Sequence, residues 1–189
     1  IGTGIIFDGQ VYRGEKGAGG EFGHMIAGDN GPVDCSCGSR ECWEAYASEK
    51  AILARYKKLL EQDDLKQNGT EIGSVIELAI NGEKHATEAL RETVYYLGNG
   101  ISNLIVGLSP QVVVVSGQIT KAWQLFAGEL SRVAQRSVLF WDVMRQRGNQ
   151  YREHIAENAP HVLDYKVELM VDGRKLDRPV NYALVRVVP

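Results

Sequence analysis

The 189-residue chain has a formal net charge of −3, and 44% of its residues are hydrophobic. This is the size of one ordinary globular domain or two small lobes, and the near-neutral charge excludes a general attraction to nucleic acid or to an anionic membrane. No apolar run approaches the roughly 18 residues that cross a bilayer, and no signal peptide is evident. We therefore expect a cytoplasmic protein without a membrane partner.

The first residues carry a strand pattern, and no initiator Met precedes them. We expect the chain to be a piece of a longer protein, with residues that complete its function lying outside it. Apolar runs at 2–7 and 10–13 flank Asp8 and Gly9, a pair that favours a hairpin turn with positive φ at both positions. A glycine-rich loop follows, and 21–26 suits a short strand.

Helical periodicity dominates the middle of the chain. Apolar residues recur at three- and four-residue intervals and predict helices over 42–60, 71–80, 83–107 and 119–139. Thr70 is the candidate N-cap of the second of these helices. The four valines at 112–115, after Pro110, predict a buried strand of the parallel type.

The C-terminal region carries weaker patterns. It is polar over 140–164, and strands are expected at 165–171 and 181–188, separated by a turn at Asp172 and Gly173. Strands that precede helices, and helices that alternate with a buried strand, predict an α/β fold with a mixed sheet.

The three cysteines cluster behind a histidine, in the spacing His24-x10-Cys35-x-Cys37-x4-Cys42. An odd number excludes a closed set of disulfides within the chain, and clustered cysteines without a secretory signal favour a metal in a reducing compartment. Zinc takes four thiolate or imidazole ligands in a tetrahedron, so a closed structural zinc site is expected in the loop 24–42. The alternative is three buried free cysteines beside an unrelated histidine.

Two carboxylates flank this loop. Glu21 lies three residues before His24, and Glu44 lies two residues after Cys42 at the start of a predicted helix. Carboxylates and imidazole are usual partners of sugar hydroxyls, so both acids are candidate ligands of a small molecule. The alternatives are a solvated loop acid at Glu21 and an acid favoured by the helix dipole at Glu44.

Glycines at two strand ends are candidates for binding a phosphate or nucleotide. Gly2, Thr3 and Gly4 offer amides and a hydroxyl at a strand end. Gly117 follows the valine strand and precedes a helix, which is a common place for a ligand crevice. The alternative for the first group is a closely packed strand.

Three stretches of the sequence carry a family resemblance. They are GTGIIFDGQVYRG at 2–14, GEFGHM at 20–25 and CSCGSRECWEAYAS at 35–48. They resemble the ROK family, whose name covers repressors, open reading frames and sugar kinases. The likeness is dense over 1–48, is supported by PQVVVVSG at 110–117, and fades beyond about residue 140.

The resemblance implies an actin-like, ribonuclease H-like ATPase fold of two lobes with a cleft between them. The chain 1–189 would be the C-terminal lobe, with a mixed sheet, flanking helices and a zinc-binding loop. The implied zinc ligands are His24, Cys35, Cys37 and Cys42. The implied sugar-binding residues are Glu21, His24 and Glu44, and the implied phosphate- or nucleotide-side residues are Gly2, Thr3, Gly4 and Gly117. One ring nitrogen of His24 would bind zinc while the other faces the sugar.

The family's kinases use an aspartate general base and an early Asp-x-Gly phosphate loop, and its repressors carry a helix-turn-helix. The resemblance places all of these upstream of this chain. We therefore expect the chain alone neither to phosphorylate a sugar nor to bind DNA, and ATP is an expected cofactor only if the whole protein is a kinase.

Three functions remain open: a sugar-sensing effector domain of a repressor, a lobe of a glucokinase-like ATP-dependent sugar kinase, and a zinc-stabilised oligomerisation module. Two features favour the repressor. Glu41 stands where the kinase branch usually has Gly before Cys42, and Ser116-Gly117-Gln118 replaces the double or triple glycine expected beside adenosine. Because family members are usually dimers or tetramers, a homo-oligomer is expected.

Overall fold

The computed structural model describes residues 1–65, 71–136, 168–171 and 182–187. Its strands form one five-stranded mixed sheet in the order β2-β1-β5-β3-β4. The strands are β1 (Gly2–Phe7), β2 (Gln10–Val11), β3 (Val112–Ser116), β4 (Glu168–Val171) and β5 (Tyr182–Arg186). β1 runs antiparallel to β2 and β5, whereas β3 is parallel to β4 and β5. The predicted α/β fold with a mixed sheet is confirmed.

The first hairpin forms as its turn residues predict. Asp8 and Gly9 have φ values of 50° and 75°, the left-handed conformation that a tight turn between twisted strands requires. The second strand is shorter than expected: Gln10 and Val11 form β2, and the amide of Tyr12 adds one hydrogen bond to the carbonyl of Ile5 in β1 at 2.8 Å.

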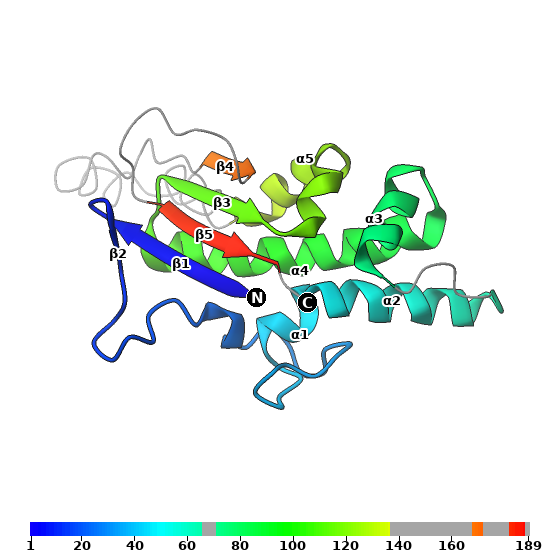
Figure 1. The fold of residues 1–189 in the computed structure, drawn as a ribbon, viewed down its shortest axis with the longest axis horizontal. Coiled ribbons are helices and arrows are strands. Elements are labelled where there is room, and N and C mark those ends of the chain that lie inside the picture. The colour runs from blue at the N-terminus through cyan, green and yellow to red at the C-terminus, as the bar shows by residue number, and fades with distance from the viewer. Residues whose placement is uncertain (66–70, 137–167, 172–181, 188–189) are drawn as a thin grey trace, which may run out of the picture.

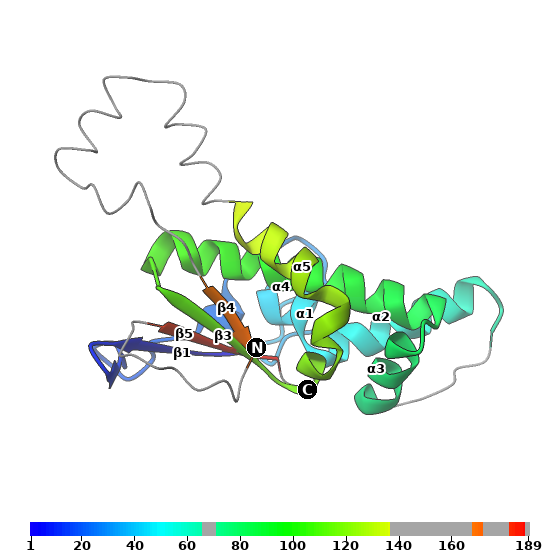
Figure 2. The same cartoon turned by 90° about the horizontal axis from the view of Figure 1, so that it is seen from above.

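The described helices gather on one face of the sheet, and the long α4 runs beside it (Figures 1 and 2). The α-helices are α1 (Trp43–Ala47), α2 (Glu49–Gln62), α3 (Ile72–Ile80), α4 (Lys84–Leu108) and α5 (Trp123–Ala134). Two 3-10 helices, η1 (Phe22–His24) and η2 (Gln118–Ala122), complete the set among the described residues. No helix in the described ranges is long and apolar enough to cross a membrane.

The strand predicted at 21–26 is wrong, because η1 occupies its middle residues, 22–24. The amide of His24 donates to the Glu21 carbonyl at 3.1 Å, which closes a tight turn. Gly23 packs so closely on the Ile1 carbonyl that a β-carbon there would overlap it. Only Ile26 forms a bridge, to Cys42.

The helix predicted over 42–60 is interrupted at Ser48. Ser48 has ψ 168°, an extended conformation, and its buried hydroxyl accepts a hydrogen bond from the amide of Ala51 as the N-cap of α2. A serine cap that starts a new helix outweighs the continuous apolar pattern. In the predicted 119–139 helix, the first residues form η2 and residues 137–139 lie outside the described part.

The main core lies between the sheet and α4. Leu97 and Ile101 of α4 and Val113 and Val115 of β3 are 0% exposed, and each such side chain contributes about 1.5–3 kcal/mol on burial. The predictions for Thr70, for 140–164 and for the turn at 172–173 fall outside the described residues.

Candidate metal centre and adjoining cavity

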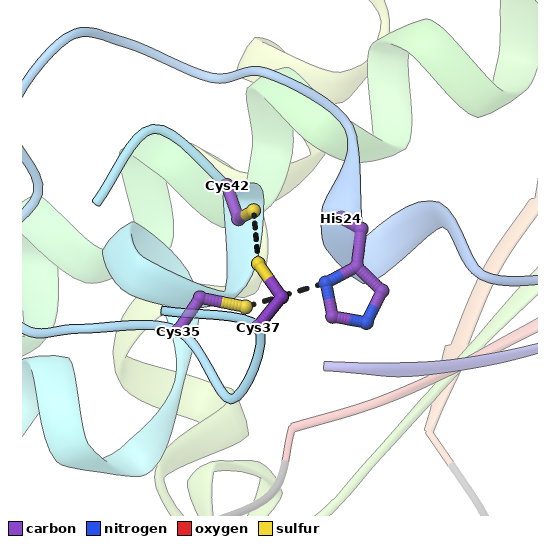
Figure 3. A group of neighbouring side chains, drawn as sticks. All are labelled: His24, Cys35, Cys37 and Cys42. Carbon is purple, nitrogen blue, oxygen red and sulfur yellow. Dashed lines mark hydrogen bonds between the residues drawn. The ribbon is translucent and has the colours of Figure 1, made fainter. Parts of the chain in front are cut away.

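The histidine and the three cysteines meet in space as their spacing predicts. One ligand atom from each of His24, Cys35, Cys37 and Cys42 lies within 4.8 Å of the others. Figure 3 shows the imidazole reaching from η1 toward sulfur atoms of the following loop and of the start of α1. His24 Nδ1 is 3.3 Å from Cys35 Sγ, and Cys37 Sγ is 3.4 Å from Cys42 Sγ. A zinc tetrahedron places its ligand atoms about 3.8 Å apart, so the group has the dimensions of a metal site.

The ionisation of the thiols also fits a cation. A hydrogen bond from the Ser39 backbone, helped by Cys42, lowers the pKa of Cys37 to about 7. Burial, followed by the neighbouring thiols, raises the pKa of Cys42 to about 12. Crowded thiolates repel one another, so all three can ionise together only if a cation binds among them. The four residues could therefore hold a metal ion.

The loop that carries the cysteines is shaped by its own backbone. The amide of Cys35 donates to the Ser39 carbonyl at 2.9 Å, and the amide of Gly38 donates to Cys35 at 2.9 Å. Gly38 has φ 87°, which favours glycine. At Gly31, a β-carbon would lie 2.8 Å from the Ala45 side chain. These contacts fix the course of the backbone that carries Cys35 and Cys37.

The two ring nitrogens of His24 face different neighbours. Nδ1 points to Cys35, whereas Nε2 lies 3.8 Å from Glu21 Oε2. Glu21 and His24 both line a cavity of about 520 Å³, beside Tyr12 and Phe22. The structure thus brings together two of the three predicted sugar-binding residues and joins them, through one imidazole, to the cysteine cluster.

Glu44 takes a different position. Its Oε1 accepts hydrogen bonds from the Ser36 amide at 3.0 Å and from the Cys35 thiol at 3.4 Å, and its Oε2 lies 2.8 Å from the backbone nitrogen of Ile1. Burial opposes the ionisation of Glu44, but these donors together hold the pKa of its carboxyl below the ordinary glutamate value. Glu44 is not among the residues that line the cavity, so its sugar-binding role stays a prediction.

The predicted phosphate-side residues lie along one part of the sheet. In the strand register, Gly2 of β1 and Ser116 of β3 both pair with Arg186 of β5. The two residues therefore lie at the same end of the sheet, separated by two strand spacings of about 5 Å each. Thr3 donates its hydroxyl to the Gly20 carbonyl, and Gly4 lies one position further along β1.

Gly117, which follows Ser116 at the same edge, packs on the chain's own backbone. Gly117 has φ 107°, and a β-carbon there would overlap the carbonyl of Val187. The requirement for glycine at this position is therefore explained by a close approach of two backbones, and a phosphate- or nucleotide-side role for Gly117 stays a prediction.

A buried acid beside Gly117 escaped the sequence reasoning. Glu49 is 3% exposed, and its Oε1 accepts a hydrogen bond from the amide of Gln118 at 3.3 Å. Burial raises its pKa, against the opposing effects of that amide and of Arg186 and Lys121. An acid in the first turn of a helix is usually solvated and favoured by the helix dipole. The local sequence around Glu49 therefore did not indicate that its side chain is buried.

The comparisons with known proteins agree with this architecture. The model of the ROK family matches residues 1–146. The chain belongs to the ROK family. A xylose repressor from Bacillus subtilis is 36% identical over 168 residues, which cover 85% of this chain and 39% of the repressor. A ROK family glucokinase from Streptomyces griseus, solved with glucose and AMPPNP, is 25% identical with a TM-score of 0.63, covering 90% of this chain and 51% of the glucokinase. The predicted actin-like fold class is confirmed, and the chain spans about half or less of either relative.

The C-terminal part also matches a second family. A model described as a protein of unknown function, DUF3141, matches residues 132–189. The residues matched by the DUF3141 model contain β4 and β5, so the strand that pairs with both β1 and β3 comes from the part of the chain where the ROK resemblance was expected to fade.

Proposed function

We propose that this chain is the sugar-sensing effector lobe of a ROK-family transcriptional regulator, stabilised by one structural zinc ion. The observation that carries the proposal is the placement of His24, whose Nδ1 faces Cys35 while its Nε2 faces Glu21 and the 520 Å³ cavity. The 36% identity to a xylose repressor over 85% of the chain supports it. DNA would be bound through an N-terminal domain outside this chain.

Zinc would be held by His24, Cys35, Cys37 and Cys42. Four protein ligands leave no open position for water, so the ion would supply folding free energy and no catalysis. A metal on Nδ1 of His24 fixes the proton on Nε2, which then acts as a hydrogen-bond donor beside Glu21.

The sugar would bind in the cavity lined by Glu21 and His24. A carboxylate accepts hydrogen bonds from two neighbouring hydroxyls, and Nε2–H donates to a third oxygen. The volume of about 520 Å³ is in the range of small-molecule sites. A sugar that binds one conformation of the loop 24–42 more tightly than another would shift the lobe toward that conformation. This shift would change the DNA affinity of the whole protein.

The buried Glu49 favours a regulator over a kinase. Its carboxylate holds the Gln118 amide at the end of β3, where the nucleotide side of the family was expected. The negative charge of Glu49 would repel a triphosphate bound there. The alternative is the C-terminal lobe of an ATP-dependent sugar kinase, which the likeness to the glucokinase with glucose and AMPPNP supports. A cytoplasmic homo-oligomer, expected from the family, is part of both versions.

Calorimetric titration of D-xylose and D-glucose tests the sugar site. We expect the parent chain to bind one of these sugars, Glu21→Ala to lose binding, and Glu15→Ala, an equal charge change outside the cavity, to retain it. Equal affinities in all three proteins would contradict the site. In the full-length protein, sugar-dependent operator release supports a regulator, whereas sugar-dependent formation of ADP identifies a kinase.

A further inference from the structure

A second cavity lies where the loop of residues 24–42, which carries the candidate metal ligands, meets α2 and α4. Its volume is about 570 Å³, and it shares no lining residue with the cavity of Glu21 and His24. The cavity is lined by residues of the loop and of three helices: Gly31 and Arg40 of the loop, Tyr46 of α1, Arg55 and Lys58 of α2, and Glu92 and Tyr96 of α4. Nothing in the proposed sugar response uses it.

One edge of the Arg55 guanidinium is fixed by the protein. Arg55 is 5% exposed, and its Nη1 donates to the Tyr46 carbonyl at 2.7 Å and to Thr93 Oγ1 at 2.8 Å. Its central carbon lies 5.3 Å from the centre of the Tyr96 ring. A guanidinium held by two hydrogen bonds and an aromatic face has little freedom to turn.

The other edge of the same guanidinium is left without hydrogen bonds. Arg55 Nε and Nη2 are buried, and neither has a hydrogen-bond partner. Glu92 Oε1 is 2.9 Å from Nε, close enough for an ion pair but misaligned for a hydrogen bond. Glu92 itself is 54% exposed, so it can swing away into solvent. Buried donors of this kind are costly unless a partner satisfies them.

The charges around this edge favour an anion. Arg40, Arg55 and Lys58 contribute three positive charges to the lining and Glu92 one negative charge. The Nε–Nη2 edge is the pair of parallel donors that binds a carboxylate or a phosphate in bidentate fashion. We propose that this cavity is a second effector site, which binds a small oxyanion on Arg55 in place of the Glu92 carboxylate.

The site adjoins the loop that carries the cysteines. Arg40 Nε donates to the Gly31 carbonyl at 3.0 Å, and the Asn30 amide donates to the Tyr46 hydroxyl at 2.8 Å. An anion bound here contacts the same loop segment that leads to Cys35, but from the side of α2 and α4. It would therefore act on that loop independently of a sugar beside Glu21.

Isothermal titration with succinate and with inorganic phosphate tests the proposal, with 1,4-butanediol as the neutral counterpart of succinate and at constant ionic strength. We expect the parent chain to bind at least one anion and not the diol. Binding of succinate alone assigns a carboxylate ligand, phosphate alone a phosphate ligand, and both a general oxyanion site. If neither anion binds the parent or Glu92→Gln, the proposal is overturned.

Two matched pairs of variants locate the binding without disturbing the core. Glu92→Gln removes the competing carboxylate and should tighten anion binding about threefold. Glu88→Gln, on the same helix with the same 54% exposure, should leave the affinity unchanged. Lys58→Gln should weaken binding about tenfold, while Lys57→Gln, the neighbouring lysine outside the lining, should not. Equal affinities within either pair would overturn the assignment.

Discussion

The indole of Trp43 lies on the backbone of Gly100 in the middle of α4. Trp43 is 0% exposed, and its Nε1 donates to the Tyr96 carbonyl at 2.8 Å. A β-carbon at Gly100 would overlap the indole ring. Since Trp43 directly follows the predicted zinc ligand Cys42, this contact connects the cysteine loop to α4, the longest helix among the described residues.

Gly100→Ala should therefore destabilise the chain. The added methyl group has no room unless Trp43 moves, and overpacking of this kind costs about 1–3 kcal/mol. Gly107→Ala on the same helix is the control, because no atom lies within 4 Å of the added carbon. It should stabilise the chain by about 0.5–1 kcal/mol through helix propensity. Urea unfolding measures both, and a Gly100→Ala variant as stable as Gly107→Ala would contradict the packing.

The proposed zinc site predicts one zinc ion per chain. Cys37→Ser removes a ligand on an exposed part of the loop, so the loss of stability would come from the metal and not from lost packing. We expect Cys37→Ser to contain no stoichiometric zinc and to melt at a lower temperature than the parent, as measured by elemental analysis and calorimetry.

A chelator separates the metal from the mutation. It should lower the melting temperature of the parent to about that of Cys37→Ser and leave the variant unchanged, because only the parent has a bound ion to lose. A parent chain whose melting temperature does not respond to the chelator and that contains no metal would remove zinc from the proposal.

Local chemistry explains which features could be predicted from the sequence. The hairpin turn at Asp8 and Gly9 depends only on two residues that tolerate positive φ. The cysteine cluster could be predicted because Cys35, Cys37 and Cys42 are close along the chain, and a loop of that length brings them together in almost any fold. His24 lies farther along the chain, but only ten residues separate it from Cys35, so the spacing alone was enough to include it as the fourth ligand.

The missed features depend on contacts between distant parts of the chain. Glu49 is buried because β3 ends beside the start of α2, which no local pattern records. The break at Ser48 reflects a cap that competes with a continuous apolar stripe. Arg55 carried a weak signal, since it lies on the buried face of its helix between Ile52 and Tyr56, where a charged residue needs an explanation.

Glu49→Gln should stabilise the chain at neutral pH. Burial raises the pKa of Glu49, so the folded state prefers the protonated form and loses stability as pH rises above the ordinary glutamate value. A glutamine keeps an oxygen that accepts from the Gln118 amide and carries no charge. The gain in melting temperature should be largest near pH 7 and shrink toward about pH 4.5. A variant less stable than the parent at pH 7 would show that the charge interactions with Arg186 and Lys121 outweigh burial.

His85 should add a second loss of stability with rising pH, in the range above its ordinary pKa of about 6.5. Its Nε2 is 2.8 Å from Asp63 Oδ2 and its Nδ1 is 2.8 Å from Glu83 Oε1, and the side chain is 11% exposed. The hydrogen bonds to Asp63 first and then to Glu83 raise the pKa of His85 above 6.5. The stabilisation is therefore complete below about pH 6.5 and is lost as pH rises through the higher folded-state value.

Melting temperatures of the parent and of His85→Gln between about pH 6 and pH 8 measure this effect. The advantage of the parent over the variant should be largest at the acidic end and decline toward pH 8. Because both proteins keep the metal site, the comparison between them cancels any change that this site contributes. Lys84→Gln is the control. Lys84 is 84% exposed and lies 3.9 Å from the same Asp63 oxygen, so this variant removes a positive charge beside Asp63 and leaves His85 in place. It should keep the pH profile of the parent. Parallel curves for the parent and His85→Gln would contradict this effect, because they would mean that folding leaves the pKa of His85 unchanged and that Asp63 and Glu83 do not stabilise its charged form.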